Sequence, residues 1–538
     1  MLLKRSRLGI VEPLFHRAKR PVLPLCADNE TWSWRNGLAG LHRRPISIGR
    51  VSSDLFCPIS PFSPPALMPT STSRTANERP APLSVRSNFV WSLGGNVLYA
   101  FCQWGVLVVL AKLCSPEIVG LYVLGITITS PIFLFAGLQL RRLQATDTNS
   151  EFQFGHYFGL QLLACAAAML ACWGAGWISG HHDAALAVIL LVGFSKSVET
   201  LSNTFYGLFQ QRERLDRISK SMVLQSVLSA AGLCGGIVLT GDIVWACGWS
   251  AIARLTAVLL YDIPSLLWLA GDVSSLDQQP LAFGHRLSAC QPLWERRPLL
   301  KLAMLGVPLG VTGMLVSLNT NFPRYFVEQF GGEAQLGIFG VLCAPLYAMH
   351  TLTKSLESSA SSQLAKRHTS GDVRGFRRLF WQLMATHTAI ALVGVAVAWK
   401  FGRPLLTLLF SADYAEHVDV FVTIMWATLV ATSAGVLMTA LIAARFIQIQ
   451  LPLITVTSLA SLAACWWLVP RFGMQGAAWS LAVSKLPYLA VGLWLIVRIS
   501  DRRAKDISPL VGDKSDPALP TRGLTPSVRQ EELLKGAA

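Results

Sequence analysis

The chain has 538 residues, of which 52% are hydrophobic and only 14% are charged, and its formal net charge is +16. An average soluble protein carries about 25% charged residues, so this composition excludes both a soluble globular enzyme and a disordered protein. The apolar residues come in long blocks, which predicts a polytopic membrane protein.

Residues 1–87 differ from the rest of the chain. They hold thirteen Lys and Arg against five Asp and Glu, which is half of the total charge excess, and they are rich in Arg, Pro and Ser. They contain no apolar run long enough for a secretory signal. We expect a basic disordered arm or a start codon assigned too far upstream, in which case Met68 is the expected start.

Twelve blocks of about 20 apolar residues follow, the length that a helix needs to cross the hydrocarbon core. Residues 401–410 are too short to cross and are expected at the membrane interface. The twelve predicted spans are 88–111, 117–139, 157–179, 184–209, 221–240, 243–270, 299–320, 334–358, 379–399, 419–443, 452–469 and 474–498.

The loops between these spans alternate in charge, and basic loops face the cytoplasm in membrane proteins. One set of loops carries most of the Lys and Arg, which predicts that this set and both termini are cytoplasmic. The polar tail at 499–538 is expected to be disordered there. The cytoplasmic set holds Arg141, Arg142, Arg212, Arg214, Arg217, Lys220, Arg286, Arg296, Arg297, Lys366, Arg367, Arg374, Arg377 and Arg378; the other loops hold Lys112, Arg324, Lys400, Arg403 and Arg471.

Two short motifs occur once in each half of the chain. Gly120-Leu121-Tyr122 is echoed by Gly337-Ile338-Phe339, and Trp249-Ser250 is echoed by Trp479-Ser480. Both pairs keep the same order and orientation, as parallel repeats would. The predicted fold class is therefore an all-α polytopic membrane protein with about 12 transmembrane helices in two six-helix bundles, 88–270 and 299–498, joined by a cytoplasmic loop at 271–298.

Polar side chains recur at helical spacing inside five predicted spans. Ionisable groups in a membrane are costly and usually face an aqueous cavity, so these stripes predict a hydrophilic centre. The stripes are Asn96, Tyr99 and Gln103; Lys196, Glu199, Asn203, Tyr206 and Gln210; Ser250, Arg254, Tyr261 and Asp262; His350, Lys354, Glu357 and Ser361; and Ser480, Lys485 and Tyr488.

The cations within these stripes are candidates for contact with a negatively charged cargo. Arg254 and Lys485 lie near mid-span, and Lys485 has no acidic residue on its own predicted helix. Lys196 and Lys354 are also candidates, although each has an acidic residue three positions later and a purely structural pairing is the alternative. Arg and Lys bind phosphate and pyrophosphate well, which favours an anionic cargo of that class.

The sequence predicts no catalytic residue, metal site or cofactor. Its eleven cysteines are scattered singly without a CxxC pair, and no GxxxxGK[ST] motif occurs. There is also no zinc-finger spacing or RNP-type motif, so nucleic acid is not an expected partner.

The stretch SNFVWSLGGNVLYAFCQWGVLVVLAKLCSPEIVGLYVLGITITSPIFLFAGLQLRRLQATD, from Ser87 to Asp147, resembles the start of bacterial polysaccharide-biosynthesis proteins of the O-antigen flippase type. These proteins belong to the multidrug/oligosaccharidyl-lipid/polysaccharide exporter superfamily. YGLFQQRERLDRISKSMVLQ resembles that family's loop after the fourth span, and FGRPLLTLLFSADY and RFGMQGAAWS are looser matches in the second half.

The resemblance implies two six-helix lobes that alternate between inward-open and outward-open states in the inner membrane. It implies a transporter that flips polyprenyl-pyrophosphate-linked oligosaccharide, with cavity cations holding the pyrophosphate. Membrane lipids and partner glycosyltransferases or a polysaccharide polymerase are the further partners it implies.

Membrane potential or coupled H⁺ or Na⁺ would drive such transport. The candidate ion-coupling residues are Glu199, Asp262, His350 and Glu357, and Asn96 and Gln103 are further candidate cavity residues. The alternatives are a drug or organic-cation antiporter of the same superfamily and, less favoured, a membrane glycan polymerase.

Overall fold

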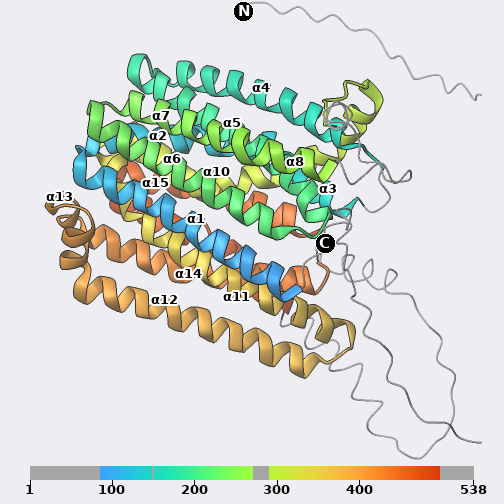
Figure 1. Ribbon diagram of the computed structural model, residues 1–538. Helices are drawn as coiled ribbons and strands as arrows, with labels where there is room; N and C mark the ends of the chain where they lie inside the picture. The colour runs from blue at the N-terminus through green and yellow to red at the C-terminus, as the bar shows by residue number, and fades with distance from the viewer. Residues whose placement is uncertain (1–84, 148–150, 271–289, 447, 497, 499–538) are drawn as a thin grey trace, which may run out of the picture. The chain divides into compact units, whose positions relative to one another are not determined.

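The computed structural model describes residues 85–147, 151–270, 290–446, 448–496 and 498 (Figure 1). Among these residues the chain forms helices and no β-strand. The predictions for Met68 and the N-terminal arm, for most of the linker loop and for the C-terminal tail fall on residues outside the described part, and they stay predictions.

The first half consists of six long helical segments and a short helix, and these pack on one another. α7, η1 and α8 continue one another as a single segment that includes one π-helical turn. The elements are α1 (Val85–Leu113), α2 (Pro116–Ala136), α3 (Leu140–Thr146), α4 (Phe154–Ile178), α5 (Asp183–Gln211), α6 (Leu215–Thr240), α7 (Ile243–Ala257), η1 (Val258–Asp262) and α8 (Ile263–Ala270).

The second half contains two very long helices, α10 and α15, that contact each other. α11, α12 and α14 pack on one another beside them (Figure 1). The elements are α10 (Arg296–Leu342), α11 (Ala344–Thr369), α12 (Val373–Leu409), α13 (Ala412–Ala415), α14 (Val418–Ala443) and α15 (Gln450–Val483).

α10 is two helices that reverse direction at Gly332. This residue has φ 74° and ψ −176°, a conformation open essentially to glycine alone. The direction of the chain follows from its contacts with α2, which run antiparallel before the kink and parallel after it. The contacts are Gly306 with Leu138, Gly310 with Phe135 and Tyr325 with Thr127 before Gly332, and Gly337 with Pro116 and Gly340 with Val123 after it.

α15 reverses in the same way at Gly473, where φ is 55° and ψ is −134°. Cys465 Sγ lies 3.3 Å from Ser480 Oγ, and farther from the turn the Tyr488 hydroxyl donates to Gln450 Oε1 at 2.8 Å. These contacts join the two arms of a helical hairpin.

Ten helical segments in the described part of the chain are long and apolar enough to cross a membrane. Gly473 divides Gln450–Ile496 into two arms that are each long enough to cross. Gly332 divides Arg296–Leu346 into a long first arm and a short second arm, and this second arm becomes long enough to cross only together with α11, which follows it at Ala344. This division recovers the twelve predicted spans. The sequence did not show that the turns within these two pairs are only one residue wide.

The two halves meet along α2 and α10, and the repeated glycines lie in this contact. A Cβ atom on Gly120 would collide with the carbonyl oxygen of Glu333, and one on Gly337 would lie 2.8 Å from the backbone nitrogen of Gly120. Each glycine thus lets the partner backbone approach closely. The motif that predicted a repeat marks the place where the two repeats touch.

The predicted basic loops gather at one end of the helices. Asn88, near the start of α1, donates to the carbonyl of Glu213 between α5 and α6 at 2.9 Å. Gln211 donates to the carbonyl of Asp147 after α3, and Lys301 near the start of α10 pairs with Glu151. The charge asymmetry read from the sequence is therefore an asymmetry between the two ends of the structure.

Several basic residues that the sequence analysis assigned to non-cytoplasmic loops lie inside helices. Arg324 is buried within α10, because the first arm of that helix runs eleven residues beyond the predicted limit of 320. Lys400 and Arg403 lie within α12, which also includes residues 401–409 as a continuation of the helix rather than as a separate segment.

We expect Gly332→Ala to destabilise the protein by about 1–3 kcal/mol, because alanine is strained at this φ and ψ although no atom lies within 4 Å of the added Cβ. The control is Gly248→Ala in α7, which also has open space but no positive φ. It should stabilise the protein by up to about 1 kcal/mol through helix propensity. Unfolding in mixed detergent micelles measures both, and equal effects would contradict the assignment of strain.

Candidate functional site

The predicted polar stripes of three spans meet at Glu199 in α5. One carboxylate oxygen, Oε2, lies 3.1 Å from the ammonium of Lys196 and 3.0 Å from Nη1 of Arg254 in α7. The other oxygen, Oε1, accepts a hydrogen bond from the hydroxyl of Tyr99 in α1 at 3.1 Å. A single carboxylate thus holds two cations and a phenol that come from three helices.

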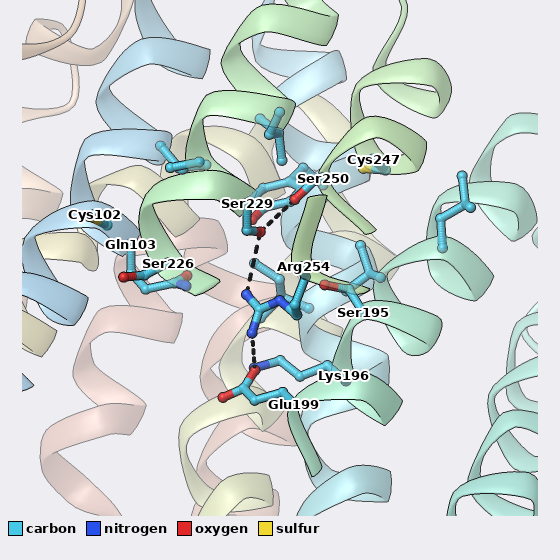
Figure 2. A pocket seen from close by; sticks show the side chains of 17 residues that line it. Cys102, Gln103, Ser195, Lys196, Glu199, Ser226, Ser229, Cys247, Ser250 and Arg254 are labelled. Carbon is cyan, nitrogen blue, oxygen red and sulfur yellow. Dashed lines mark hydrogen bonds and ion pairs between the residues drawn. The ribbon is translucent and has the colours of Figure 1, made fainter. Parts of the chain in front are cut away.

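Arg254 is fixed on its other side by hydroxyl groups. Its Nη2 donates to Ser229 Oγ at 3.4 Å, and Ser229 is hydrogen-bonded to Ser250 at 2.7 Å (Figure 2). Arg254 is only 5% exposed, and its Nε has no hydrogen-bond partner among the described residues. Arg254 is therefore a buried and oriented cation.

These residues line a pocket among α1, α2, α5, α6 and α7 (Figure 2). Its side chains enclose about 640 Å³ of space, part of which is open to solvent. The side chains of Lys196 and Glu199 are 31% and 25% exposed, so the open side of the pocket reaches them rather than Arg254. Gln103 also lines this pocket, as predicted for a cavity residue, whereas Asn96 is exposed and bonds back to the carbonyl of Ser92.

The charges of this cluster do not cancel. Lys196 and Arg254 contribute two positive charges and Glu199 one negative charge, so the cluster carries +1 when all three are ionised. A charge in a partly buried site is stabilised best by an opposite charge. The pocket therefore suits an anionic ligand group beside Lys196.

Asp262 belongs to a separate network deeper in the same half. It lies in the π-helical turn η1 and is completely buried. Its Oδ2 accepts from the side-chain amide of Gln225 at 2.9 Å, while Oδ1 has no hydrogen-bond partner within the part of the chain that the structure describes. Gln225 also donates to Ser202 and Tyr206, which links α5, α6 and η1 in one polar core.

In the second half, Glu357 of α11 is held by neighbours that the sequence did not suggest. Its Oε1 lies 3.6 Å from Nε2 of His387 in α12, and its Oε2 accepts from Thr439 in α14 at 3.2 Å. Lys354 is exposed, and no hydrogen bond or ion pair between described residues joins it to Glu357. The structure therefore does not pair these two residues, and Glu357 instead contacts His387 and Thr439 on neighbouring helices.

The remaining two candidates of the second half are less constrained. Lys485 is half-buried, and no hydrogen bond or ion pair within the described part of the chain involves its ammonium group. His350 lies in α11, but its side chain is outside the described residues.

Sequence reasoning missed Ser229, Gln225 and His387 as members of these clusters. Each is a polar side chain within an apolar span, which is the signal that identified the stripes. Ser221, Gln225 and Ser229 follow one another at a spacing of four on α6, so helical spacing could have found Gln225 and Ser229. His387 has only apolar residues three and four positions away on either side, so spacing could not single it out. Among the described residues, no group of three or more His, Cys, Asp or Glu is placed to hold a metal ion.

Comparison with known proteins shows one curated relative and several solved structures of similar fold. The chain is 25% identical over 417 residues to a capsular polysaccharide biosynthesis protein, CapF, from Staphylococcus aureus, covering 77% of this chain and 99% of that protein. No protein-family model matches the chain.

Solved structures show the fold. The chain is similar to the inward-facing conformation of a multidrug resistance MATE family transporter of the MOP superfamily, with TM-score 0.53, 13% identity and coverage of 79% of this chain and 96% of that one. The outward-facing conformation of such a transporter gives TM-score 0.53, 14% identity and coverage of 78% and 97%. A MOP superfamily transporter from Pyrococcus furiosus, described as having a binding pocket of reverse polarity, gives TM-score 0.52, 15% identity and coverage of 78% and 96%.

These similarities confirm the resemblance and the fold class expected from the sequence. The chain is a multi-pass membrane protein with a MATE-like fold, built from two repeated bundles.

We expect Glu199→Gln to destabilise the protein by about 2–4 kcal/mol, because it leaves Lys196 and the buried Arg254 without a counter-charge. The double variant Glu199→Gln with Arg254→Met should recover part of this loss. Unfolding in mixed micelles measures the difference between the single and double variants. Strictly additive losses would show that the ion pair does not couple these residues.

Proposed function

We propose that this protein transports a lipid-linked glycan with an anionic headgroup across the bacterial inner membrane by alternating access. The cargo class is a polyprenyl-pyrophosphate-linked oligosaccharide used for polysaccharide export. Support comes from the transporter fold and from the relative named for capsular polysaccharide biosynthesis. The protein acts as a transporter and not as an enzyme.

The observation that carries the proposal is the net positive charge of the cluster formed by Lys196, Glu199 and Arg254. Two cations share this one carboxylate, and Lys196, which lines the pocket, is the more exposed of them. A diphosphate offers several acceptor oxygens for such a group and compensates the spare charge. Arg254 acts behind Lys196 by holding Glu199 in place.

The charges of the pocket argue against the organic-cation antiporter, and the positions of the acidic residues outside the long helices argue against the glycan polymerase. A pocket for organic cations would present an excess of carboxylates, whereas this one presents an excess of cations. A polymerase would need acidic residues on a sizeable loop outside the helices. The acidic residues Asp413, Glu416 and Asp419 lie in or beside short α13 and at the start of α14.

The energy source follows from the charge of the cargo. Moving negative charge out of a negative interior is favourable by about 2.3 kcal/mol per charge per 100 mV. Membrane potential alone is therefore sufficient in principle, and H⁺ or Na⁺ exchange adds to it. Glu199, Asp262 and Glu357 are the described acidic candidates for ion coupling.

We expect Lys196→Gln to reduce flipping at least about tenfold, because one charge-assisted contact to the cargo contributes about 1.5–3 kcal/mol. Lys196→Arg should retain most of the activity, and Lys485→Ala should reduce it if the second half also contacts the headgroup. The measurement is the leaflet distribution of polyprenyl-pyrophosphate glycan in cells that carry each variant as the sole copy.

The matched control is Lys400→Gln, which removes an exposed lysine of α12 far along the chain from the pocket. This variant should transport the glycan as well as the wild type does. An unchanged leaflet distribution in cells depleted of the protein, together with altered sensitivity to cationic drugs, would favour the antiporter instead.

A further inference from the structure

A cluster of basic and aromatic side chains lies at the end of the first half where the basic loops gather. α6 packs on α1 and on the continuous segment of α7, η1 and α8 (Figure 1). Its N-cap is Arg214, and its first two turns carry Arg217 and Lys220. Trp91 of α1 and Trp268 of α8 contact these cations. We call these five residues the basic–aromatic patch.

The two tryptophans hold the cations of the patch. Cζ of Arg217 lies 3.9 Å from the centre of the Trp268 ring, and Cζ of Arg214 lies 5.6 Å from the same centre. The ammonium of Lys220 lies 5.1 Å from the centre of the Trp91 ring. Both tryptophans are exposed, and tryptophan is enriched where a membrane meets water. The patch therefore has the aromatic residues expected at the level of lipid headgroups.

The protein neutralises only part of the positive charge of the patch. Arg214 donates to both carboxylate oxygens of Asp216, at 2.9 and 3.1 Å, and the ammonium of Lys220 lies 4.0 Å from the same carboxylate. Arg217 has no ion pair and no side-chain hydrogen bond among the described residues, and its Nε is buried without a partner there. The ring contact thus orients Arg217 and leaves its terminal N–H groups available to a ligand.

The charge count indicates the class of ligand. Three cations against Asp216 leave a net charge of +2, and the adjacent Arg212 and Glu213 are both exposed and cancel each other. Guanidinium and ammonium groups bind phosphate oxygens through charge-assisted hydrogen bonds. Basic sites between transmembrane helices bind phospholipid headgroups in this way. A phospholipid with two phosphodiester groups, each with one negative charge, matches the excess.

Apolar surface continues from the patch along two helices. On α1, Leu98 lies seven residues after Trp91 and therefore on the same helical face. On α6, Val227 lies seven residues after Lys220 in the same way. Leu98 and Val227 are both exposed. The acyl chains of a lipid whose phosphates contact the patch therefore have apolar side chains to lie against.

The patch is separate from the pocket at Glu199. Ser226 of α6 lines that pocket. Arg217 lies nine positions before Ser226, which is about two and a half helical turns, so the two side chains leave α6 on opposite sides. A ligand bound at Arg217 is therefore on the other side of α6 from the pocket.

We propose that the basic–aromatic patch is a binding site for an anionic membrane phospholipid, with preference for one that carries two phosphodiester groups, as cardiolipin does. One phosphate accepts hydrogen bonds from Arg217 and Lys220, and the second lies toward Arg214. A bound lipid joins α1, α6 and α8 at this end of the first half. The inference does not depend on which cargo the protein carries.

Lipid binding is measured on purified full-length protein in detergent micelles by native mass spectrometry. The protein is titrated with tetraoleoyl cardiolipin, dioleoyl phosphatidylglycerol or dioleoyl phosphatidylcholine. One cardiolipin should bind at least about tenfold more tightly than phosphatidylcholine, with phosphatidylglycerol between them, because these lipids carry two, one and no net negative charges. Equal affinity for the three lipids would overturn the proposal.

The double variant Arg217→Gln with Lys220→Gln should weaken cardiolipin binding at least about tenfold, because it removes two charge-assisted contacts. The matched control is Arg377→Gln with Arg378→Gln in α12. It removes the same charge from two exposed arginines that have no ring contact among the described residues. The control should bind cardiolipin as the wild type does. Equal weakening by both pairs would mean that surface charge alone attracts the lipid, and the site would be rejected.

A variant that changes one exposed side chain keeps the proposal testable if the double variant does not fold. Lys220→Gln alone should weaken cardiolipin binding about threefold, through loss of one partly screened contact. Binding equal to that of the wild type would count against the site.

Undecaprenyl pyrophosphate distinguishes a phospholipid site from an entry site for the cargo. It should not displace cardiolipin from the wild type. Displacement that is lost in the Arg217→Gln, Lys220→Gln variant would assign the patch to the cargo and overturn the proposal. Failure of the proposed function, seen as an unchanged leaflet distribution of the glycan, leaves the lipid titrations unaffected.

Discussion

The organisation of this protein depends on the cost of leaving a charge unpaired within a membrane. Glu199 of α5 forms ion pairs with Lys196 of its own helix and with Arg254 of α7. The same carboxylate accepts a hydrogen bond from Tyr99, so it connects α5 with both α7 and α1. In the second half Glu357 does the same for α11, α12 and α14. The groups that hold each bundle together are therefore ionisable side chains inside the membrane-spanning segments.

The contact between the halves follows a different principle. With lipid as the solvent, helices gain from close backbone approach more than from burial of apolar surface. Gly120 of α2 and Gly337 of α10 supply this approach, and each would collide with the opposite backbone if it carried a side chain. The equivalent Trp249 and Trp479 are both exposed, while Ser250 and Ser480 are both buried, so the two repeats place matching residues in matching surroundings.

The two halves nevertheless carry different chemistry. The first half surrounds a pocket lined by Lys196, Glu199 and Arg254, whereas the second half buries His387 against the carbonyl groups of Leu383 and Thr353 and the carboxylate of Glu357. The two halves are joined by α10, which packs on α2 of the first half and on α15 of its own half.

The sequence by itself determined the membrane class, the twelve crossings, the repeat and most of the ionisable residues in the spans, because apolar length, spacing and loop charge are local properties. It could not determine pairings between helices. Arg254 lies 55 positions from Glu199, and His387 lies 30 positions from Glu357, so spacing suggested only the neighbours Lys196 and Lys354. It also placed Arg324 in a loop, since the extent of α10 depends on its packing against α2. Only the tertiary structure decided which cations share a carboxylate, because burial and distance are set by how the helices pack.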